Sequence, residues 1–376
     1  MAKIGSHELH ELPRISFEIE IVLYNPLASW NIEFPTIRVI RINVIHMKFL
    51  IIRFSSIGDI VLTTPVVRCL KKQVPGAIIH YTTKYAFHSI VESNPYIDKI
   101  HFYNNDLEAL IDELKLENFD YVIDLHHNLR TLKVKRALGK KSFSFNKLNI
   151  RKWIYTNFRW NVMPDVHIVD RYLDTLSSFG VKNDGAGLDY FIPDKHKVKE
   201  TDIPASHHAG YIGIAIGAAL NTKKMPVDKL KTLCSIIDHP IILMGGKEDN
   251  RHAEEISIID PVKIYNACGK FNLNESADLV RRAKLIITND TGLMHIAAAL
   301  RKPIVSIWGN TVPEFGMPAY FGRNAGTDIR FEVKPLYCRP CSKIGYKKCP
   351  HGHFKCMRKH DENLIAHEAM QLLNKS

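Results

Sequence analysis

Residues 47–59 read MKFLIIRFSSIGD, and this stretch decides the fold. The run over residues 47–54 is almost continuously apolar, which is typical of a parallel strand buried on both faces. Residues 55–59 are small or polar and predict a tight turn, and residues 60–73 have the composition of a helix. A buried strand, a tight turn and a helix together form the first unit of a Rossmann-like domain.

The same alternation continues along the chain. Further short apolar runs, separated by helical stretches, lie at residues 77–81, 99–102, 121–125, 211–216, 241–244, 262–265, 285–288 and 304–308. This pattern predicts α/β architecture with parallel sheets covered by helices on both faces. A length of 376 residues predicts two such domains rather than one.

A polar segment over residues 193–209 is the predicted linker between the domains. Residues 1–46 show no clear period, and we expect them to be a dispensable extension or the product of an upstream start codon. The expected division is an extension at 1–46, a first domain at 47–195, a second at 205–335, a cysteine-rich segment at 336–360 and a final helix at 361–376.

The composition indicates an anionic partner. A net charge of +12 and a pI of about 9.2 suit a nucleic acid, a membrane surface or a small substrate with phosphates or carboxylates. No stretch approaches the roughly 20 apolar residues needed to cross a bilayer, and the pattern of a secretory signal is missing. We therefore expect a cytoplasmic protein.

Polar residues follow three of the predicted strands, where open α/β sheets place their ligands. Asp59 follows the first, as a general base in one interpretation and a helix-capping acid in the other. Thr291 and Gly292 begin a predicted helix with His295 one turn later, so these residues can address one diphosphate. The alternative there is a capped helix with a buried, hydrogen-bonded histidine. Lys223, after another strand, is either a phosphate contact or a solvated lysine.

These segments, at residues 54–65, 217–226 and 289–295, resemble in this order the signature of the heptosyltransferases of glycosyltransferase family nine. The resemblance covers nearly everything from Met47 onward. It implies a GT-B architecture, in which two Rossmann-like domains face a cleft and a final helix returns to the first domain. It also implies inverting, metal-independent transfer of a heptose from ADP-heptose, without a required cofactor, to a lipopolysaccharide inner-core or related glycolipid acceptor.

Carried onto this chain, the resemblance makes Asp59 the general base. The donor-binding residues that it implies are Thr222, Lys223, Glu248, Asp290, Thr291, Gly292 and His295. Asp249 is an alternative to Glu248 as the ribose contact. Met225 departs from the family, which usually has Trp at this place in a Lys-x-Trp-Pro pattern.

The first domain receives the acceptor in this family, and its basic residues are the expected acceptor contacts. They are Arg130, Lys133, Lys135 and Arg136, together with Ser56 and Gly58 of the first turn. An anionic acceptor would explain the net charge. The basic stretch is alternatively a solvated face, or a site of peripheral contact with the anionic inner membrane.

Four cysteines cluster near the C-terminus, namely Cys338, Cys341, Cys349 and Cys356, with His351 and His353 nearby. The first pair has the spacing of metal ligands, which predicts a structural zinc site. The alternative is a set of reduced structural thiols.

Two other functions compete with this prediction. One is a related glycosyltransferase that uses another nucleotide sugar for a different surface polysaccharide. The other is a basic nucleic-acid-binding protein, favoured by the pI and a zinc-knuckle-like cysteine set. Because that function leaves the polar strand-end loops unexplained, we expect no nucleic-acid partner.

Overall fold

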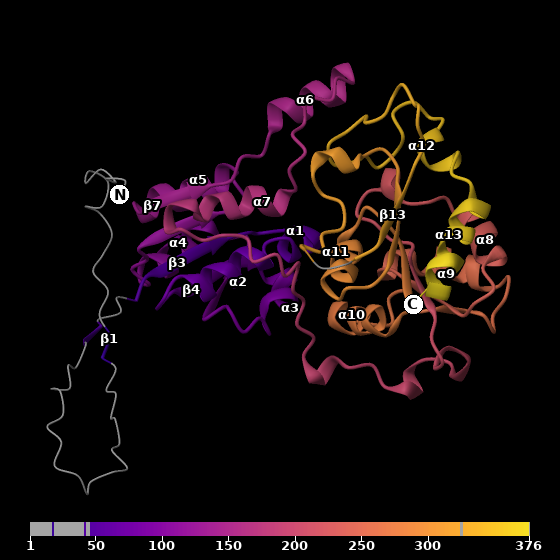
Figure 1. The fold of residues 1–376 in the computed structure, drawn as a ribbon, viewed down its shortest axis with the longest axis horizontal. Coiled ribbons are helices and arrows are strands. Elements are labelled where there is room, and N and C mark those ends of the chain that lie inside the picture. Colours follow the sequence, from indigo (N-terminus) through magenta and orange to yellow (C-terminus); the bar gives the residue numbers. More distant parts are fainter. Residues whose placement is uncertain (1–16, 19–40, 43–45, 324–325, 376) are drawn as a thin grey trace, which may run out of the picture.

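The apolar runs of the sequence become the strands of two parallel sheets. The computed structural model describes residues 17–18, 41–42, 46–323 and 326–375. In Figure 1 the two sheets and their helices form domains that lie side by side, the first indigo to magenta and the second mostly orange to yellow. The predicted GT-B-type architecture of two Rossmann-like domains is confirmed.

The first sheet has the order β5-β4-β3-β6-β7 and is parallel throughout. Its strands are β3 (Lys48–Ile52), β4 (Ile78–Lys84), β5 (Lys99–Tyr103), β6 (Tyr121–Asp124) and β7 (Lys141–Ser144). Alternate residues of β3 enter two different hydrophobic clusters, Phe49 on one face and Leu50 on the other. The central strand is therefore buried on both faces, as its continuous apolar run predicted.

Helices lie between these strands, and two more follow the last strand. They are α1 (Ile57–Val61), α2 (Thr64–Gln73), α3 (His88–Val91), α4 (Leu107–Lys115), α5 (Leu129–Leu138), α6 (Asn149–Phe158) and α7 (Ile168–Leu173). The single helix expected over residues 60–73 is two helices. Pro65 lies in the first turn of α2, where its missing N–H costs no hydrogen bond.

The second sheet has the order β10-β9-β8-β11-β12-β13, again parallel. Its strands are β8 (Ile212–Ala215), β9 (Ile241–Met244), β10 (Ile264–Asn266), β11 (Leu285–Asn289), β12 (Ile304–Trp308) and β13 (Asp328–Glu332). Four helices lie between them, α8 (Val227–Ile236), α9 (Asn250–Ser257), α10 (Leu273–Arg282) and α11 (Gly292–Ala299).

Both sheets share one topology. The first strand of each domain is central, two strands are added on one side, and the chain then crosses to the other side. The strand order consequently reverses between β3 and β6 and between β8 and β11. Open α/β sheets bind ligands outside the carboxyl ends of the strands at such a point.

The two domains meet where α1 contacts α11, near the middle of the molecule in Figure 1. Glycine makes this approach possible on both sides. A Cβ on Gly292 would lie 2.8 Å from Cβ of Ile57, and a Cβ on Gly58 would collide with the ring of His295. The first turns of both helices therefore face each other across the domain boundary.

The predicted linker lies along the second domain. It contains three short 3-10 turns, Asp194–His196, Glu200–Asp202 and Ala205–His207. The backbone N–H of Val198 donates to the buried carboxylate of Asp278 at 3.0 Å. This bond ties the segment to α10.

The C-terminal helix α13 (Glu362–Lys375) also lies on the second domain, against α8, β11 and β12. The prediction that this helix returns to the first domain is wrong. Ile365 and Ala369 join the second domain's hydrophobic cluster, and Lys229 of α8 pairs with Glu362 at 2.7 Å. The spacing of Ile365 and Ala369 makes one side of the helix apolar, but an apolar side does not by itself identify the surface that covers it.

Most of the extension predicted at residues 1–46 lies outside the described residues. Within it, β1 (Phe17–Glu18) and β2 (Arg41–Ile42) pair with each other and not with the five-stranded sheet. Among the helices of the described ranges, none combines the length and the apolar composition needed to span a membrane.

Candidate functional site

A cleft of about 680 Å³ opens between the domains at the carboxyl ends of both sheets. Nine of the predicted site residues line it, although they come from four separate loops. These are Ser56, Gly58, Asp59, Lys223, Glu248, Asp290, Thr291, Gly292 and His295. The structure thus brings together in one place what the sequence distributes over more than 200 residues.

Asp59 lies in the first turn of α1 and faces the cleft. One carboxylate oxygen accepts hydrogen bonds from the backbone N–H of Ser56 at 3.2 Å and from its hydroxyl at 2.7 Å. The other oxygen pairs with Nη2 of Arg53 at 2.7 Å. Asp59 therefore does make the contacts of a helix-capping residue. Its carboxylate nevertheless still faces the cleft, and 22% of the side chain is exposed.

Burial alone would raise the pKa of Asp59, because it penalises the charged form. The Arg53 guanidinium and the two Ser56 hydrogen bonds outweigh burial and hold the pKa of Asp59 below its ordinary value of 3.8. Arg53 is itself fixed, since it donates to the carbonyl of Ser55 and to the hydroxyl of Tyr172. Asp59 is consequently an ionised carboxylate at neutral pH.

The opposite wall of the cleft is the first turn of α11. Thr291 is its N-cap residue and is in extended conformation, so the first backbone N–H groups of the helix point toward the cleft. The Asp290 carboxylate forms an ion pair with Lys223 at 2.6 Å and accepts a hydrogen bond from the Thr311 hydroxyl at 2.8 Å. Lys223 is thereby positioned beside a helix N-terminus. An anion bound there would be stabilised both by the helix N-terminus and by the Lys223 ammonium.

His295 is buried, with 2% of its surface exposed, yet it lines the cleft. Burial holds the pKa of His295 below 6.5 despite the attraction of Asp290 and Asp59, so the imidazole is neutral at pH 7. Its Nδ1 has no hydrogen-bond partner among the described residues. The alternative of a buried, fully hydrogen-bonded histidine therefore does not describe this residue.

The loop after β9 separates the two candidates for the ribose contact. Glu248 is exposed and lines the cleft. Asp249 also borders the cleft but is buried, where it accepts from the backbone of Gly246 at 3.1 Å and pairs with Lys224 at 2.6 Å. Among the described residues, the Glu248 carboxylate has no such partner, so Glu248 is the one of the two that is free to contact a ligand.

Two residues of the loop after β8 point away from the cleft. The hydroxyl of Thr222 is buried and donates to the carbonyl of Tyr346 at 3.0 Å, while it accepts from that residue's N–H at 2.7 Å. Met225 lies in the second domain's core. Thr222 therefore anchors the cysteine-rich segment and does not reach the predicted donor site.

The four predicted acceptor cations lie on α5, outside the cleft lining. Lys135 pairs with the buried Asp124 at 2.9 Å, and the Arg130 guanidinium lies 5.8 Å from the centre of the Tyr103 ring. Lys133 and Arg136 are exposed. The basic segment was identified correctly, but these members of it do not face the site.

Three other cations do lie near Asp59, and the sequence reasoning missed them. Lys343 lines the cleft, and Lys152 lies 5.9 Å from the ring centre of Phe315, which also lines it. Burial, with repulsion from Arg171, lowers the pKa of Lys152 to about 8. Lys147 likewise has a lowered pKa, because of burial and then of Arg53. The signal that was available is the basic composition of the two segments that carry them.

The cysteine-rich segment forms no disulfide. Cys338 and Cys356 are buried, and burial together with neighbouring thiols raises the pKa of Cys341 to about 11 and of Cys356 to about 12. The thiols are therefore neighbours, although no three of them have sulfur atoms within 4.8 Å of one another. A zinc site would require the sulfur atoms to move closer together. Zinc binding therefore stays a prediction.

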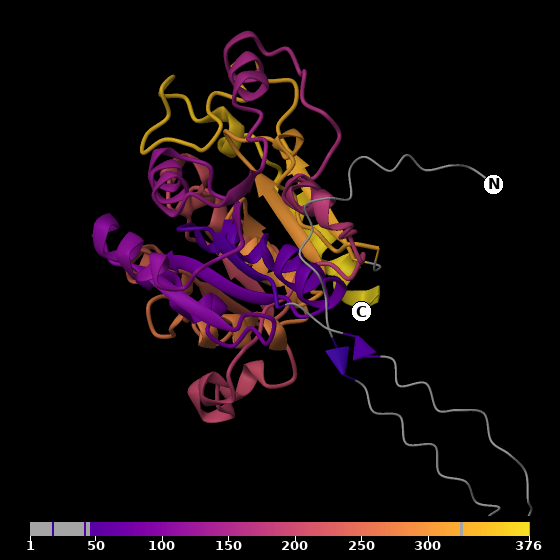
Figure 2. The same cartoon turned by 90° about the vertical axis from the view of Figure 1, so that its left-hand side faces the viewer.

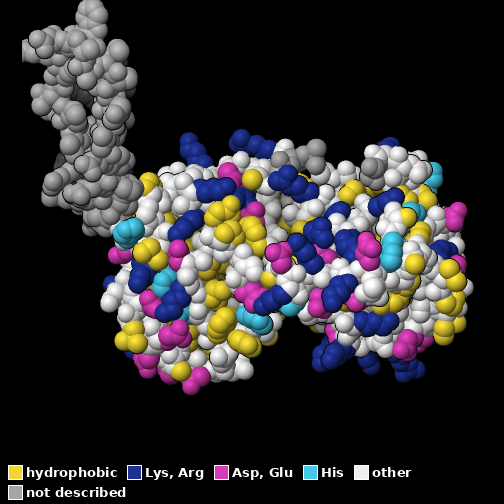
Figure 3. All heavy atoms as spheres, turned by 90° about the horizontal axis from the view of Figure 1, so that it is seen from below, with side chains coloured by type: hydrophobic (Ala, Val, Ile, Leu, Met, Phe, Trp, Pro, Cys, Tyr) yellow, Lys and Arg dark blue, Asp and Glu magenta, His cyan; other side chains and the backbone are white. Residues whose placement is uncertain are grey.

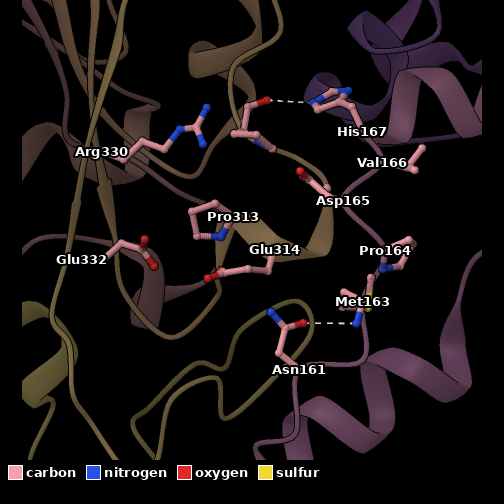
Figure 4. A pocket seen from close by; sticks show the side chains of 12 residues that line it. Asn161, Met163, Pro164, Asp165, Val166, His167, Pro313, Glu314, Arg330 and Glu332 are labelled. Atoms are coloured by element: carbon pink, nitrogen blue, oxygen red, sulfur yellow. Dashed lines mark hydrogen bonds between the residues drawn. The ribbon is translucent and has the colours of Figure 1, made fainter.

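A second hollow of about 360 Å³ lies between the segment before α7 and the second domain. Figure 4 shows Asp165 and His167 on one side and Glu314, Arg330 and Glu332 on the other. His167 is hydrogen-bonded to the carbonyl of Pro318 at 3.1 Å. With three carboxylates and one guanidinium, this hollow suits an anionic ligand less well than the cleft does.

Comparison with known proteins identifies the family. Residues 107–343 match the model for "Glycosyltransferase family 9 (heptosyltransferase)". Lipopolysaccharide heptosyltransferase 1 of Campylobacter coli is 28% identical over 70% of this chain and 84% of its own length. A family 9 glycosyltransferase from Veillonella parvula superposes with a TM-score of 0.71 at 23% identity, covering 88% of this chain and 98% of that one. The structure of E. coli heptosyltransferase WaaC with ADP superposes with a TM-score of 0.63 at 18% identity, covering 87% and 100%.

Proposed function

The chain belongs to glycosyltransferase family 9, the heptosyltransferase family, and we propose that it transfers a heptose from ADP-heptose to an anionic lipopolysaccharide-type acceptor. The observation that carries this proposal is the arrangement of one cleft. An ionised carboxylate lies on its first-domain wall, and a helix N-terminus with a lysine lies on its second-domain wall. The Campylobacter coli relative is a lipopolysaccharide heptosyltransferase, which supports the proposed acceptor class. The structure of WaaC contains ADP, which supports the proposed donor class.

In the proposed reaction, an acceptor hydroxyl attacks the anomeric carbon of the heptose. A new carbon–oxygen bond forms, the bond to the diphosphate breaks, and ADP leaves with the bonding electrons. Asp59 takes the proton of the hydroxyl, and its pairing with Arg53 keeps it unprotonated and oriented beforehand. A carboxylate with a lowered pKa is a weak base, so proton transfer occurs late, once bond formation has made the hydroxyl acidic.

The negative charge that develops on the leaving ADP lies, in this proposal, against the first turn of α11. Backbone N–H groups there and the ammonium of Lys223 stabilise it. His295 adds a neutral hydrogen bond through a nitrogen that has no protein partner among the described residues. Glu248, exposed in the same cleft, is proposed to contact the ribose. None of these roles requires a metal ion.

The acceptor side of the cleft is supported by charge. Lys147, Lys152 and Lys343 lie near Asp59, and an inner-core acceptor carries carboxylates or phosphates. Ser56, whose hydroxyl already donates to Asp59, lies at the same wall. We propose these lysines as acceptor contacts in place of the cations on α5.

The test replaces Asp59 with Asn in the full-length chain. We expect transfer to fall at least about a hundredfold, while the affinity for ADP changes less than about threefold, because Asp59 lies across the cleft from α11. The control is Ser56→Ala, which removes a hydrogen bond to the same carboxylate and leaves the proton acceptor in place. Near-normal turnover of Asp59→Asn, or an equal loss in both variants, would remove Asp59 from the role of base.

A further inference from the structure

The outer face of α6 carries a cluster of exposed aromatic and aliphatic side chains. Ile150 is 76% exposed, Trp153 56%, Phe158 53% and Trp160, just after the helix, 68%. The rings contact each other edge-on or tilted, with centroids 5.5 Å apart for Trp153 and Phe158 and 5.6 Å for Phe158 and Trp160. Soluble surfaces rarely carry two exposed tryptophans in one patch, so this cluster indicates an interaction surface.

The opposite face of α6 is the one that holds the helix to the protein. Tyr155 packs edge-on against Phe315 with centroids 5.9 Å apart, and Lys152 lies over the same ring. At 100° per residue, Ile150 and Trp153 fall on the side away from this contact, whereas Phe158 lies on the flank, about 60° from Tyr155. Figures 1 and 2 both show α6 standing off from the two sheets at the upper edge of the molecule. The apolar face of this helix therefore points outward.

A second segment lies beside α6. Nε of Arg159 donates to the carbonyl of Tyr337 at 3.0 Å, which joins the end of the helix to the cysteine-rich segment. Tyr337 is 71% exposed and Ile344 is 62% exposed. We call α6, Trp160 and the exposed residues 337–348 the aromatic surface.

The two segments that carry the aromatic surface are basic in sequence. Between Asp124 and Asp165 the sequence has ten Lys or Arg residues and no Asp or Glu, and between Glu332 and Asp361 it has eight and none. Arg151, Lys347 and Lys348 are exposed members of these segments. The face away from α6, seen from below in Figure 3, instead carries Lys and Arg mixed with Asp and Glu. Charge separation of this kind distinguishes one side of the molecule.

We infer that the aromatic surface docks on an anionic lipid bilayer. Tryptophan and tyrosine prefer the headgroup region, apolar side chains enter it, and each nearby lysine or arginine is attracted by anionic lipids. The surface also adjoins the cleft, because Lys343 and Ile344 belong to both. Docked in this way, the cleft receives a lipid-linked acceptor from the plane of the membrane. That last consequence rests on the proposed function, whereas docking itself does not.

The docking test uses the full-length chain and sedimented vesicles of phosphatidylethanolamine and phosphatidylglycerol. We expect binding to these vesicles, weaker binding at high salt, and little binding to phosphatidylcholine alone. Trp153→Ser/Trp160→Ser should lower the affinity at least about tenfold. The matched control is Ile258→Ser/Val262→Ser, which removes two apolar side chains that are 75% and 74% exposed at the end of α9 and beyond it. It should bind like the wild type, and all three proteins should unfold at similar temperatures.

Kinetics separates the two parts of the inference. With an acceptor embedded in vesicles the tryptophan variant should lose activity, and with an acceptor fragment that lacks acyl chains it should match the wild type. Absence of transfer by the wild type would refute the proposed function, and the vesicle assay would still decide docking. Wild-type protein that ignores anionic vesicles, or equal binding by both double variants, would overturn the inference. So would a chain that self-associates through the two tryptophans and not with lipid, because the occupant would then be a second copy.

Discussion

Arg53 decides the protonation of Asp59. The burial of that carboxylate favours its neutral form, and the ion pair with Arg53 is the largest interaction that opposes burial. A group whose pKa is lowered in the folded protein stays ionised as the pH falls, down to that lowered pKa. The activity that depends on Asp59 should therefore be flat from neutral pH down to the ordinary carboxyl range.

Arg53→Gln should change this pH dependence. Without the guanidinium, burial raises the pKa of Asp59, so kcat/KM should decline on the acid side at a higher pH than in the wild type. Activity at pH 8 should be affected less than activity at pH 5. The measurement is kcat/KM across that range, with Arg53→Lys as the control that keeps the charge. Parallel profiles for Gln and wild type would contradict the assigned electrostatic role.

His295 should show both a structural and a functional effect when it is replaced by Ala. Its ring is buried and packs against Gly58, so the melting temperature should fall. The variant should also lose the proposed hydrogen bond from the ring nitrogen to the ADP-sugar. That bond is worth about 1–2 kcal/mol, which is about five- to thirtyfold in kcat/KM for the ADP-sugar. Both are measured on one preparation. Normal donor kinetics in a destabilised protein would leave His295 with a packing role only.

The sequence predicted the donor wall better than the acceptor wall, for a physical reason. Lys223, Asp290 and His295 follow strands closely, and the ends of parallel strands converge on one edge of the sheet. The positions of Lys152 and Lys343 depend instead on how α6 and the cysteine-rich segment pack, which no local pattern encodes. Thr222 illustrates the same limit, because its partner Tyr346 lies 124 residues away.

At the scale of elements, buried strands were predictable and marginal ones were not. β3 and β11 are apolar over most of their length and were found within a residue or two of their ends. Within the two parallel sheets, the strands that were missed are β7 and β13, which are edge strands with the polar sequences KSFS and DIRFE. An edge strand buries less surface, so its sequence carries a weaker periodic signal.

The contact between α1 and α11 depends on Gly58 at the close approach. Gly58→Ala places a methyl group against the ring of His295, so the two helices must separate. We expect a loss of stability of about 1–3 kcal/mol and weaker binding of ADP, because the cleft walls move apart. Thermal unfolding and ADP titration measure these two effects.

Gly139→Ala is the control for that substitution. Gly139 ends α5 at a φ of +63°, and a Cβ there meets nothing within 4 Å. Alanine should cost about 1 kcal/mol of backbone strain and leave ADP affinity unchanged. Equal ADP affinity in the two variants would show that the helix contact does not shape the cleft.

At the scale of the whole molecule, the described residues connect the domains covalently only through the segment around residues 193–209. The other connections are contacts, such as α1 with α11 and the N–H of Ile168 donating to the carbonyl of Gly316 at 2.7 Å. A ligand that touches both walls of the cleft therefore adds an interaction between domains as well as within one. This arrangement couples ligand binding to the stability of the entire fold.

ADP should raise the melting temperature of the full-length protein, because it binds the folded cleft and not the unfolded chain. A ligand at a hundred times its Kd stabilises a folded protein by about 2.7 kcal/mol, which corresponds to a rise of about 5 °C for a chain of this size. Lys223→Ala should reduce that rise, because it removes a cation beside the first turn of α11.

A single-stranded oligonucleotide is the decisive comparison, since the basic composition alone would also suit a nucleic-acid-binding protein. Its phosphates can contact the exposed lysines, but the cleft is built for a compact anion at a helix end, so we expect no comparable rise. Stabilisation by the oligonucleotide and not by ADP would reverse the assignment of the cleft.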